Sequence, residues 1–137
     1  MRPSTTFVLS LPIADRRTSH AFYGPGLGFE TPGALADDGV PEPLVVAVND
    51  QTQLMLIPSD GFGWVIADRE VAAPGQIECV LSISTDSNDE VDGWLAQAQT
   101  AGATVVSAAA EQPWGYTGTF ADPDGNVWMV TADTRFA

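Results

Sequence analysis

The segment of residues 112–130 (QPWGYTGTFADPDGNVWMV) constrains the fold of this chain more than any other. Residues 117–120 are extended in character, since Thr and Phe suit a pleated surface, and residues 126–131 form a second β-rich run. Between them stands Asp-Pro-Asp-Gly, in which proline presets φ, aspartate bonds the local backbone and glycine accepts a positive φ. The segment therefore predicts a β-hairpin close to the end of the chain.

A strand-helix-strand-strand-strand order is predicted twice along the chain. Helices are expected from Asp15, as N-cap, to about Tyr23, and over residues 86–101 behind an Asp86 or Ser87 cap. Each half is too small to bury both faces of its sheet, so the two should combine into one curved sheet. Before the hairpin, strands are predicted at residues 6–11, 28–31, 44–48, 53–57, 77–84 and 104–107. Residues 32–43 are expected to form a loop and residues 58–63 a break between elements.

Composition limits the class of protein. The chain has 137 residues, 45% of them hydrophobic, which suits one compact domain. Five arginines face 18 acidic residues, for a net charge of −13, so nucleic acid and anionic membranes are not expected as partners. This charge could attract a cationic ligand, or it could serve only to keep the protein soluble.

The lone Cys79 excludes an intrachain disulfide and is expected to be buried. No signal peptide and no membrane-length apolar run is found, which favours a cytoplasmic protein.

Three groups of residues, in the same order along the chain, resemble one known superfamily. The hairpin carries Trp-Gly-Tyr and then Phe-Ala-Asp-Pro-Asp-Gly-Asn-Val-Trp, residues 11–29 resemble the opening strand and helix, and residues 86–103 resemble the second helix. On these motifs the chain resembles the glyoxalase, bleomycin-resistance and extradiol-dioxygenase superfamily, also called vicinal oxygen chelate proteins. The resemblance implies an α+β fold in which two βαβββ modules form a curved mixed sheet around a cleft, usually in a homodimer. It places module one at about residues 6–66, a linker at about 67–75 and module two at about 76–133 of a single domain.

The resemblance also implies where a divalent metal ion would be held. Its ligands in metal-using members are His, Glu or Gln side chains on the first and last strand of each module. Carried over one position at a time, these ligands fall at Val8, Met55, Glu78 and Met129, and only Glu78 can coordinate a metal. The single histidine, His20, lies in the first predicted helix. We therefore predict no metal and no other cofactor.

An apolar, aromatic ligand site is the remaining prediction. Met side chains line adaptable pockets, and aromatic rings stack on planar or cationic groups, although the same residues could pack the core or a dimer interface. Glu78 could face the cleft as a base or cation-holding group, or it could face solvent. The predicted ligand-binding residues are Met55, Phe62, Trp64, Glu78, Trp114, Tyr116 and Met129.

The predicted function is therefore binding without chemistry. By resemblance, the chain is a metal-free small-molecule-binding homodimer that sequesters a planar or cationic compound such as an antibiotic. The alternative is a lyase or dioxygenase of the same superfamily with a degenerate metal site that uses Glu78. A third interpretation is an interaction module whose cleft has lost its ligand. Superfamily resemblance alone does not decide among them, because one fold hosts several functions.

Overall fold

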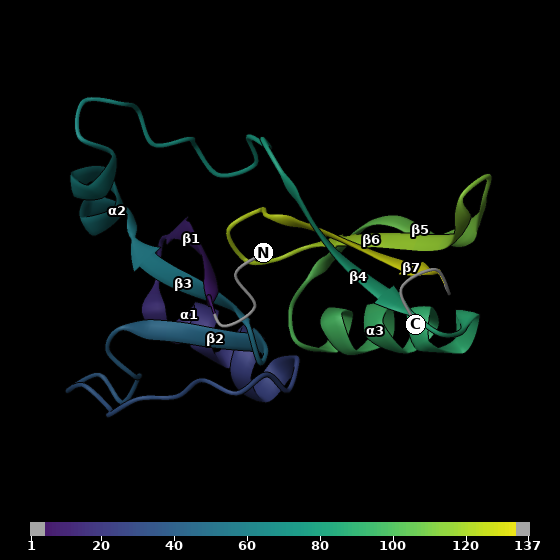
Figure 1. Ribbon diagram of the computed structural model, residues 1–137, viewed down its shortest axis with the longest axis horizontal. Coiled ribbons are helices and arrows are strands. Elements are labelled where there is room, and N and C mark those ends of the chain that lie inside the picture. Colours follow the sequence, from purple (N-terminus) through teal and green to yellow (C-terminus); the bar gives the residue numbers. More distant parts are fainter. Residues whose placement is uncertain (1–4, 134–137) are drawn as a thin grey trace. The chain divides into compact units, whose positions relative to one another are not determined.

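A computed structural model describes residues 5–133. The chain divides after Val71 into two compact units, Met1–Val71 and Ala72–Ala137, each with its own sheet and helices (Figure 1). The predicted α+β class is confirmed. No helix in the described part of the chain is long and apolar enough to cross a bilayer.

The first unit is built around a three-stranded mixed sheet. Its strands lie in the order β1-β3-β2, with β1 parallel and β2 antiparallel to the central β3. One face of the sheet is apolar and buried, through Leu11, Ile13, Leu44, Val46, Leu54 and Leu56. The elements of this unit are β1 (Phe7–Ile13), α1 (Arg16–Ala21), the π-helical turn η1 (Phe22–Gly26), β2 (Leu44–Asn49), β3 (Thr52–Pro58) and α2 (Ser59–Ile66).

The first helix begins as predicted and ends later than predicted. Asp15 is its N-cap, and its side chain accepts a hydrogen bond from the Thr18 backbone N–H at 2.9 Å. The helical path then continues through η1, so that Pro25 lies inside it instead of ending it. This π-helical turn buries Phe22 and Tyr23, whose rings meet edge to face at 4.9 Å. Burial of these two large rings accounts for the extra turn.

Two predictions for the first unit are wrong. The strand expected at residues 28–31 is a single β-bridge between Glu30 and Ala47, because Gly28 has φ +85° and Pro32 has no N–H to donate. The break expected at residues 58–63 is instead the start of α2, which packs against β1 and β3. Gly61 permits that close packing, since a Cβ there would lie 3.2 Å from Cγ2 of Ile57. The helix forms despite the low helix propensity of its two glycines, Gly61 and Gly63, although none of its residues is buried.

The expected loop at residues 32–43 is present, and Arg16 of α1 fixes it. The guanidinium Nε donates to Asp38 Oδ2 at 2.9 Å and Nη1 lies 3.1 Å from Glu42 Oε2. Nη2 donates to the carbonyl oxygens of Val40 and Pro41 at 3.1 and 3.0 Å. The bond from Arg16 holds the pKa of the Asp38 carboxyl below its ordinary value.

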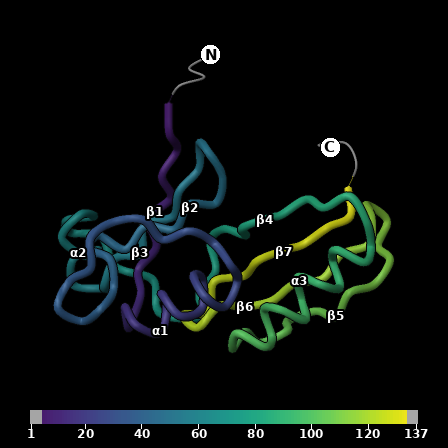
Figure 2. Tube along the Cα trace, turned by 90° about the horizontal axis from the view of Figure 1, so that it is seen from below, coloured from purple at the N-terminus to yellow at the C-terminus, as the bar shows by residue number. Residues whose placement is uncertain are grey.

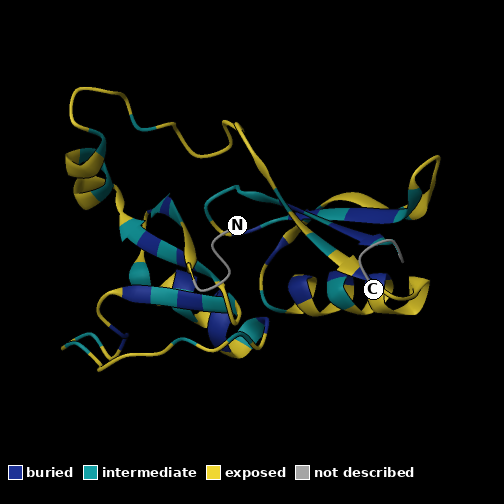
Figure 3. Cartoon of the chain, in the orientation of Figure 1, coloured by how far each residue is buried: buried dark blue, intermediate teal, exposed yellow. Residues whose placement is uncertain are grey.

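The second unit carries a four-stranded sheet in the order β4-β7-β6-β5, with β4 parallel to β7 and the others antiparallel. Helix α3 lies along one face, and its buried residues Val91, Leu95 and Ala98 meet that face (Figures 1 and 2). Apart from the half-buried Trp94, the other residues of α3 are exposed (Figure 3). The elements are β4 (Val80–Thr85), α3 (Asn88–Thr100), β5 (Thr104–Gln112), β6 (Gly115–Ala121) and β7 (Val127–Ala132).

The closing hairpin and its turn are confirmed. Asp122 Oδ1 accepts from the backbone N–H groups of Asp124 and Asn126, both at 2.9 Å, while Oδ2 accepts from the Asn126 side chain at 3.0 Å. Gly125 has φ +89°, the conformation for which glycine was expected in the turn. The helix cap is confirmed as well, because Ser87 accepts from the Glu90 N–H at 3.2 Å.

The strand expected from residue 77 begins only at Val80. Val80 pairs with Val127, so a longer ladder would place Cys79 and Glu78 opposite Asn126 and Gly125. Those two residues belong to the hairpin turn, whose backbone bonds close on Asp122. Cys79 is consequently exposed, and the prediction that it is buried is wrong.

Candidate ligand-binding site

Each sheet has one face turned away from its buried core. In the second unit, the rings of Phe120 and Trp128 stack with their centroids 6.2 Å apart on the side of the sheet that faces α3. Because successive side chains of a strand point to opposite faces, the residues before and after these two point away from α3. We call this other side the open face of the four-stranded sheet. Its residues on three of the strands are Val80, Ser82 and Ser84 of β4, Thr117, Thr119 and Ala121 of β6, and Val127, Met129 and Thr131 of β7, and β5 adds the residues paired with β6, Thr104, Ser107 and Ala110.

Trp114 lies at one end of this open face. Its indole Nε1–H donates to Thr117 Oγ1 at 3.0 Å, and that hydroxyl lies 3.1 Å from Thr131 Oγ1. Although Trp114 is 58% exposed, its one polar atom is thus already bonded within the unit. Thr117 and Thr131 are both buried. The indole therefore has a defined orientation and an accessible surface, which suits stacking on a planar molecule.

Tyr116 lies on the opposite side of the sheet. Its hydroxyl donates to Asp92 Oδ1 of α3 at 2.7 Å, and this bond is the main reason why the pKa of Tyr116 is above its ordinary value. Trp114 lies in the turn before β6 and is outside the alternation of the strand, and Gly115, with φ +136°, separates it from Tyr116. Of the predicted site residues in this unit, the structure brings Trp114 and Met129 to one face and places Tyr116 on the other.

The middle of the open face carries Met129 of β7 and Thr119 of β6, which are paired across the two strands. Both are half-buried. Thr119 Oγ1 is the one buried side-chain polar atom, among residues 5–133, for which no hydrogen-bond partner is found. Sequence reasoning missed Thr119, because a threonine in a strand gives no sign of whether its hydroxyl has a partner.

The first unit has a comparable open face. Strand alternation places Met55 there beside Ser10 and Val45, its partners on β1 and β2. The predicted aromatic residues of this unit both lie on α2, where Phe62 is half-buried and Trp64 is 85% exposed. A break between elements was expected at residues 58–63, whereas the structure has a short helix there that carries both side chains.

The metal-ligand positions of the superfamily can be tested by strand register. In the first unit Ser10 pairs with Met55, and in the second Ser82 pairs with Met129. The residue two before Ser82 is Val80, so Val80 and not Glu78 is the counterpart of Val8 in β1. The prediction that Glu78 occupies a strand position is wrong, because Glu78 is exposed in the segment before β4.

All four positions are then apolar: Val8, Met55, Val80 and Met129. None offers the nitrogen or carboxylate donor that a first-row divalent ion needs, so these residues do not fit the metal. No cluster of three or more His, Cys, Asp or Glu residues suited to a metal is found between residues 5 and 133. His20 lies in α1, as predicted, with Nε2 3.2 Å from Thr31 Oγ1.

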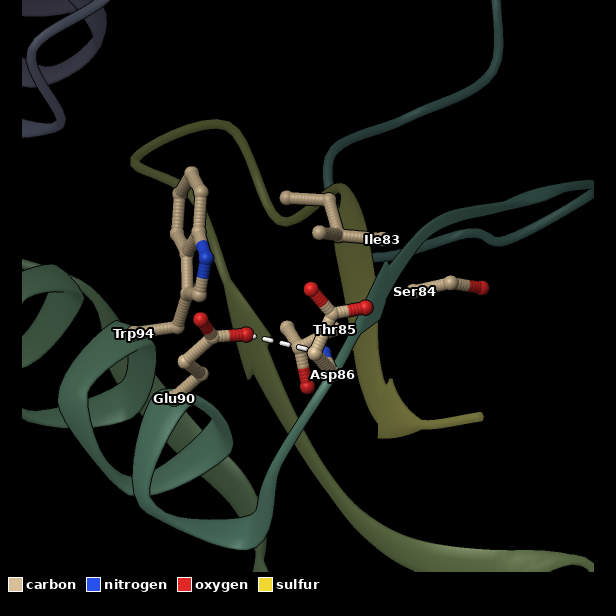
Figure 4. Close-up of a pocket in the computed structure, with 6 residues that line it drawn as sticks. All are labelled: Ile83, Ser84, Thr85, Asp86, Glu90 and Trp94. Atoms are coloured by element: carbon tan, nitrogen blue, oxygen red, sulfur yellow. Dashed lines mark hydrogen bonds between the residues drawn. The ribbon is translucent and has the colours of Figure 1, made fainter. Parts of the chain in front are cut away.

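Apart from the open faces, a concavity of about 470 Å³ lies between β4 and α3. It is lined by Ile83, Ser84, Thr85, Asp86, Glu90 and Trp94 (Figure 4). Ile83 and Trp94 form its apolar part, and Ser84 points away from them. Glu90 is engaged in the helix cap, where Oε2 accepts from the Asp86 N–H at 2.8 Å. Sequence analysis did not identify this hollow.

The open faces are free of charge. Across the seven strands the one charged residue is Glu111 of β5, which is paired with Tyr116 and therefore shares the α3 side with it. The other acidic residues lie in the loops, turns and helices. An apolar surface with hydroxyls and one fixed indole remains for a ligand.

Comparison with known proteins agrees with this architecture. The family model of the Glyoxalase/Bleomycin resistance protein/Dioxygenase superfamily matches residues 7–130, so the chain belongs to this superfamily. No curated protein matches the chain.

Several solved structures are similar over nearly their whole length. A hypothetical protein from S. aureus is 25% identical, with a TM-score of 0.76 over 96% of this chain and 94% of that one. A glyoxalase-related enzyme from Fulvimarina pelagi is 24% identical, with a TM-score of 0.79 over 95% and 88%. TnmS3, an antibiotic-binding protein from a Streptomyces species, is 27% identical, with a TM-score of 0.67 over 98% and 99%.

Proposed function

We propose that this chain is a metal-independent binding protein that holds a small planar organic compound, such as an antibiotic, on the open face of its four-stranded sheet. The observation that carries the proposal is the replacement of every metal-ligand position by Val or Met in register. Lewis-acid and oxygen-activating chemistry of the superfamily type needs donors at those positions. Binding needs only an apolar surface with a few placed polar groups.

The similarity to TnmS3 supports the same proposal. That protein is described as antibiotic-binding, and the two chains align over almost their full lengths. Trp114 would supply the main contact, because its N–H is bonded to Thr117 while its ring remains exposed. Met129, on the same open face, has a flexible side chain that can adapt to ligands of different shape.

Ligand titration monitored by tryptophan fluorescence and calorimetry tests the proposal. The probes are bleomycin, the planar cation proflavine and the neutral planar compound flavone, each with EDTA and then with Zn²⁺, Ni²⁺, Fe²⁺ or Mn²⁺. We expect at least one probe to bind with an affinity that EDTA leaves unchanged. Trp114→Ala should weaken binding about tenfold, whereas Trp64→Ala, a matched change of an exposed tryptophan on α2, should leave it within about twofold.

The alternative enzyme function has a distinct result. One tightly bound metal ion per chain, lost in Glu78→Ala, would favour the lyase or dioxygenase and overturn the proposal. Failure of all three probes to bind would also count against it.

We further propose that the protein is a cytoplasmic homodimer, as the superfamily resemblance implies. Light scattering should then give twice the mass of one chain, and the mass of a single chain would refute the dimer.

A further inference from the structure

The charge of the chain and the charge of its open face point to different ligands. The net charge of −13 is carried by residues outside the open face, while the face itself holds Val, Ala, Met, Ser and Thr. A cation bound on this face would meet no carboxylate among the residues of the face itself, so the loss of its hydration there would be unfavourable. The face is therefore better suited to an uncharged molecule.

Three threonine hydroxyls of β6 and β7 lie on the open face, and two of them have hydrogen-bond partners. Thr117 Oγ1 accepts from Trp114 and lies within hydrogen-bond distance of both Thr131 Oγ1 and the Gly115 carbonyl oxygen. Thr119 Oγ1 is buried and has no partner. Buried polar atoms in folded proteins are nearly always paired, so an exception calls for an explanation. A hydrogen bond from Thr119 Oγ1 to an oxygen or nitrogen atom of a bound ligand would provide that explanation.

The position of Thr119 fits that role. It lies two residues from Thr117 on the same strand. Thr119 is therefore about 7 Å further along the face than Thr117, which accepts the hydrogen bond from Trp114. A molecule of two or three fused or linked rings that stacks on Trp114 would reach it. The Thr119 side chain is itself partly exposed, so rotation about χ1 can bring the hydroxyl to the surface.

Resting on the proposed function, we infer that the ligand is an uncharged planar molecule with a carbonyl or hydroxyl oxygen, and that Thr119 Oγ1 hydrogen-bonds to this oxygen. The hydroxyl can donate to a carbonyl or accept from a hydroxyl, and it keeps no formal charge in either case. Thr119 thus selects for oxygen-bearing neutral ligands, while Trp114 supplies stacking without regard to charge.

Affinities of flavone and proflavine for four proteins test the inference: the wild type, Thr119→Val, Thr119→Ser and Trp114→Ala. We expect the wild type to prefer flavone. Thr119→Val, which keeps the shape and removes the hydroxyl, should weaken flavone about fivefold to tenfold, while Thr119→Ser should stay within about threefold of the wild type. Without ligand, Thr119→Val should unfold at the same temperature as the wild type or higher, because the hydroxyl it removes has no partner.

The outcomes separate this inference from the proposed function. If flavone binds, and Trp114→Ala weakens it while Thr119→Val does not, the inference is wrong and the proposed function stands. A preference for proflavine also overturns the inference. A fall in melting temperature for Thr119→Val would show that the hydroxyl serves the fold. Absence of binding by both probes would refute the inference, and failure of bleomycin as well would refute the proposed function on which it rests.

Discussion

Replacing Gly118 with alanine tests how closely α3 packs on the four-stranded sheet. A Cβ at this position would overlap Cδ1 of Leu95, lie 3.2 Å from its Cγ, and approach the Ala109 backbone Cα to 3.2 Å. Leu95 is buried on α3 and Gly118 is buried on β6. The backbone of Gly118 is not in the left-handed region, so the effect of the substitution comes from packing alone.

The expected size of the effect follows from that contact. Overpacking a closely packed core typically costs 1–3 kcal/mol, and we expect about 2 kcal/mol for Gly118→Ala because a backbone atom as well as a side chain must move. Gly93→Ala is the matched control, since nothing lies within 4 Å of its added Cβ and the site is exposed on α3. That change should stabilise the protein by about 0.5–1 kcal/mol.

Urea unfolding followed by circular dichroism measures both changes as shifts in midpoint at constant slope. Adding Leu95→Ala gives a further check, because the smaller side chain leaves room for the new Cβ. The double variant should be more stable than the sum of the single effects by at least about 0.5 kcal/mol. If Gly118→Ala matches Gly93→Ala, or if the double variant is additive, the packing we describe between α3 and β6 is wrong.

Three further changes test local features. Ser87→Ala removes the N-cap of α3 and should lower the free energy of unfolding by about 1 kcal/mol, while Ser87→Asp should preserve it; equal losses would argue against capping. Asp122→Ala removes the carboxylate oxygens that accept three hydrogen bonds in the hairpin turn, and it should lower the free energy of unfolding in urea by roughly 3 kcal/mol. A loss under about 1 kcal/mol would contradict the role of Asp122 in stabilising the turn. Because the folded-state pKa of Asp38 is lowered by Arg16, its stabilising effect is present at neutral pH and is lost as the pH falls through that pKa. The melting temperatures of the wild type and Asp38→Asn should therefore converge on acidification, and a gap that does not depend on pH would refute the linkage.

Sequence predictions succeeded where neighbouring residues decide the structure. The Asp122–Gly125 turn and the Asp15 and Ser87 caps each depend on a side chain bonding backbone within four residues of itself. Such bonds form in any tertiary setting, so they can be read from short motifs. The superfamily and the α+β class followed from these motifs in order, and both are confirmed.

Sequence predictions failed where a distant partner decides the structure. Glu78 was expected on a strand, but the strand starts where β7 begins to offer ladder bonds, at Val127. A break was expected at residues 58–63, yet the segment is helical from Ser59 and lies against β1 and β3. Both outcomes depend on residues remote in sequence, which a local pattern does not report.

The sequence by itself determined the order of elements in the second unit, the positions of the turns and caps, and the lack of metal-binding side chains at most of the superfamily's ligand positions. Only the tertiary structure decided which side chains share a face. It placed Trp114 on the same face as Met129 and Tyr116 against Asp92 of α3, because Trp114 lies in the turn before β6 whereas Tyr116 lies in the strand. It also left Thr119 Oγ1 without a partner, since pairing across strands depends on register and not on residue type.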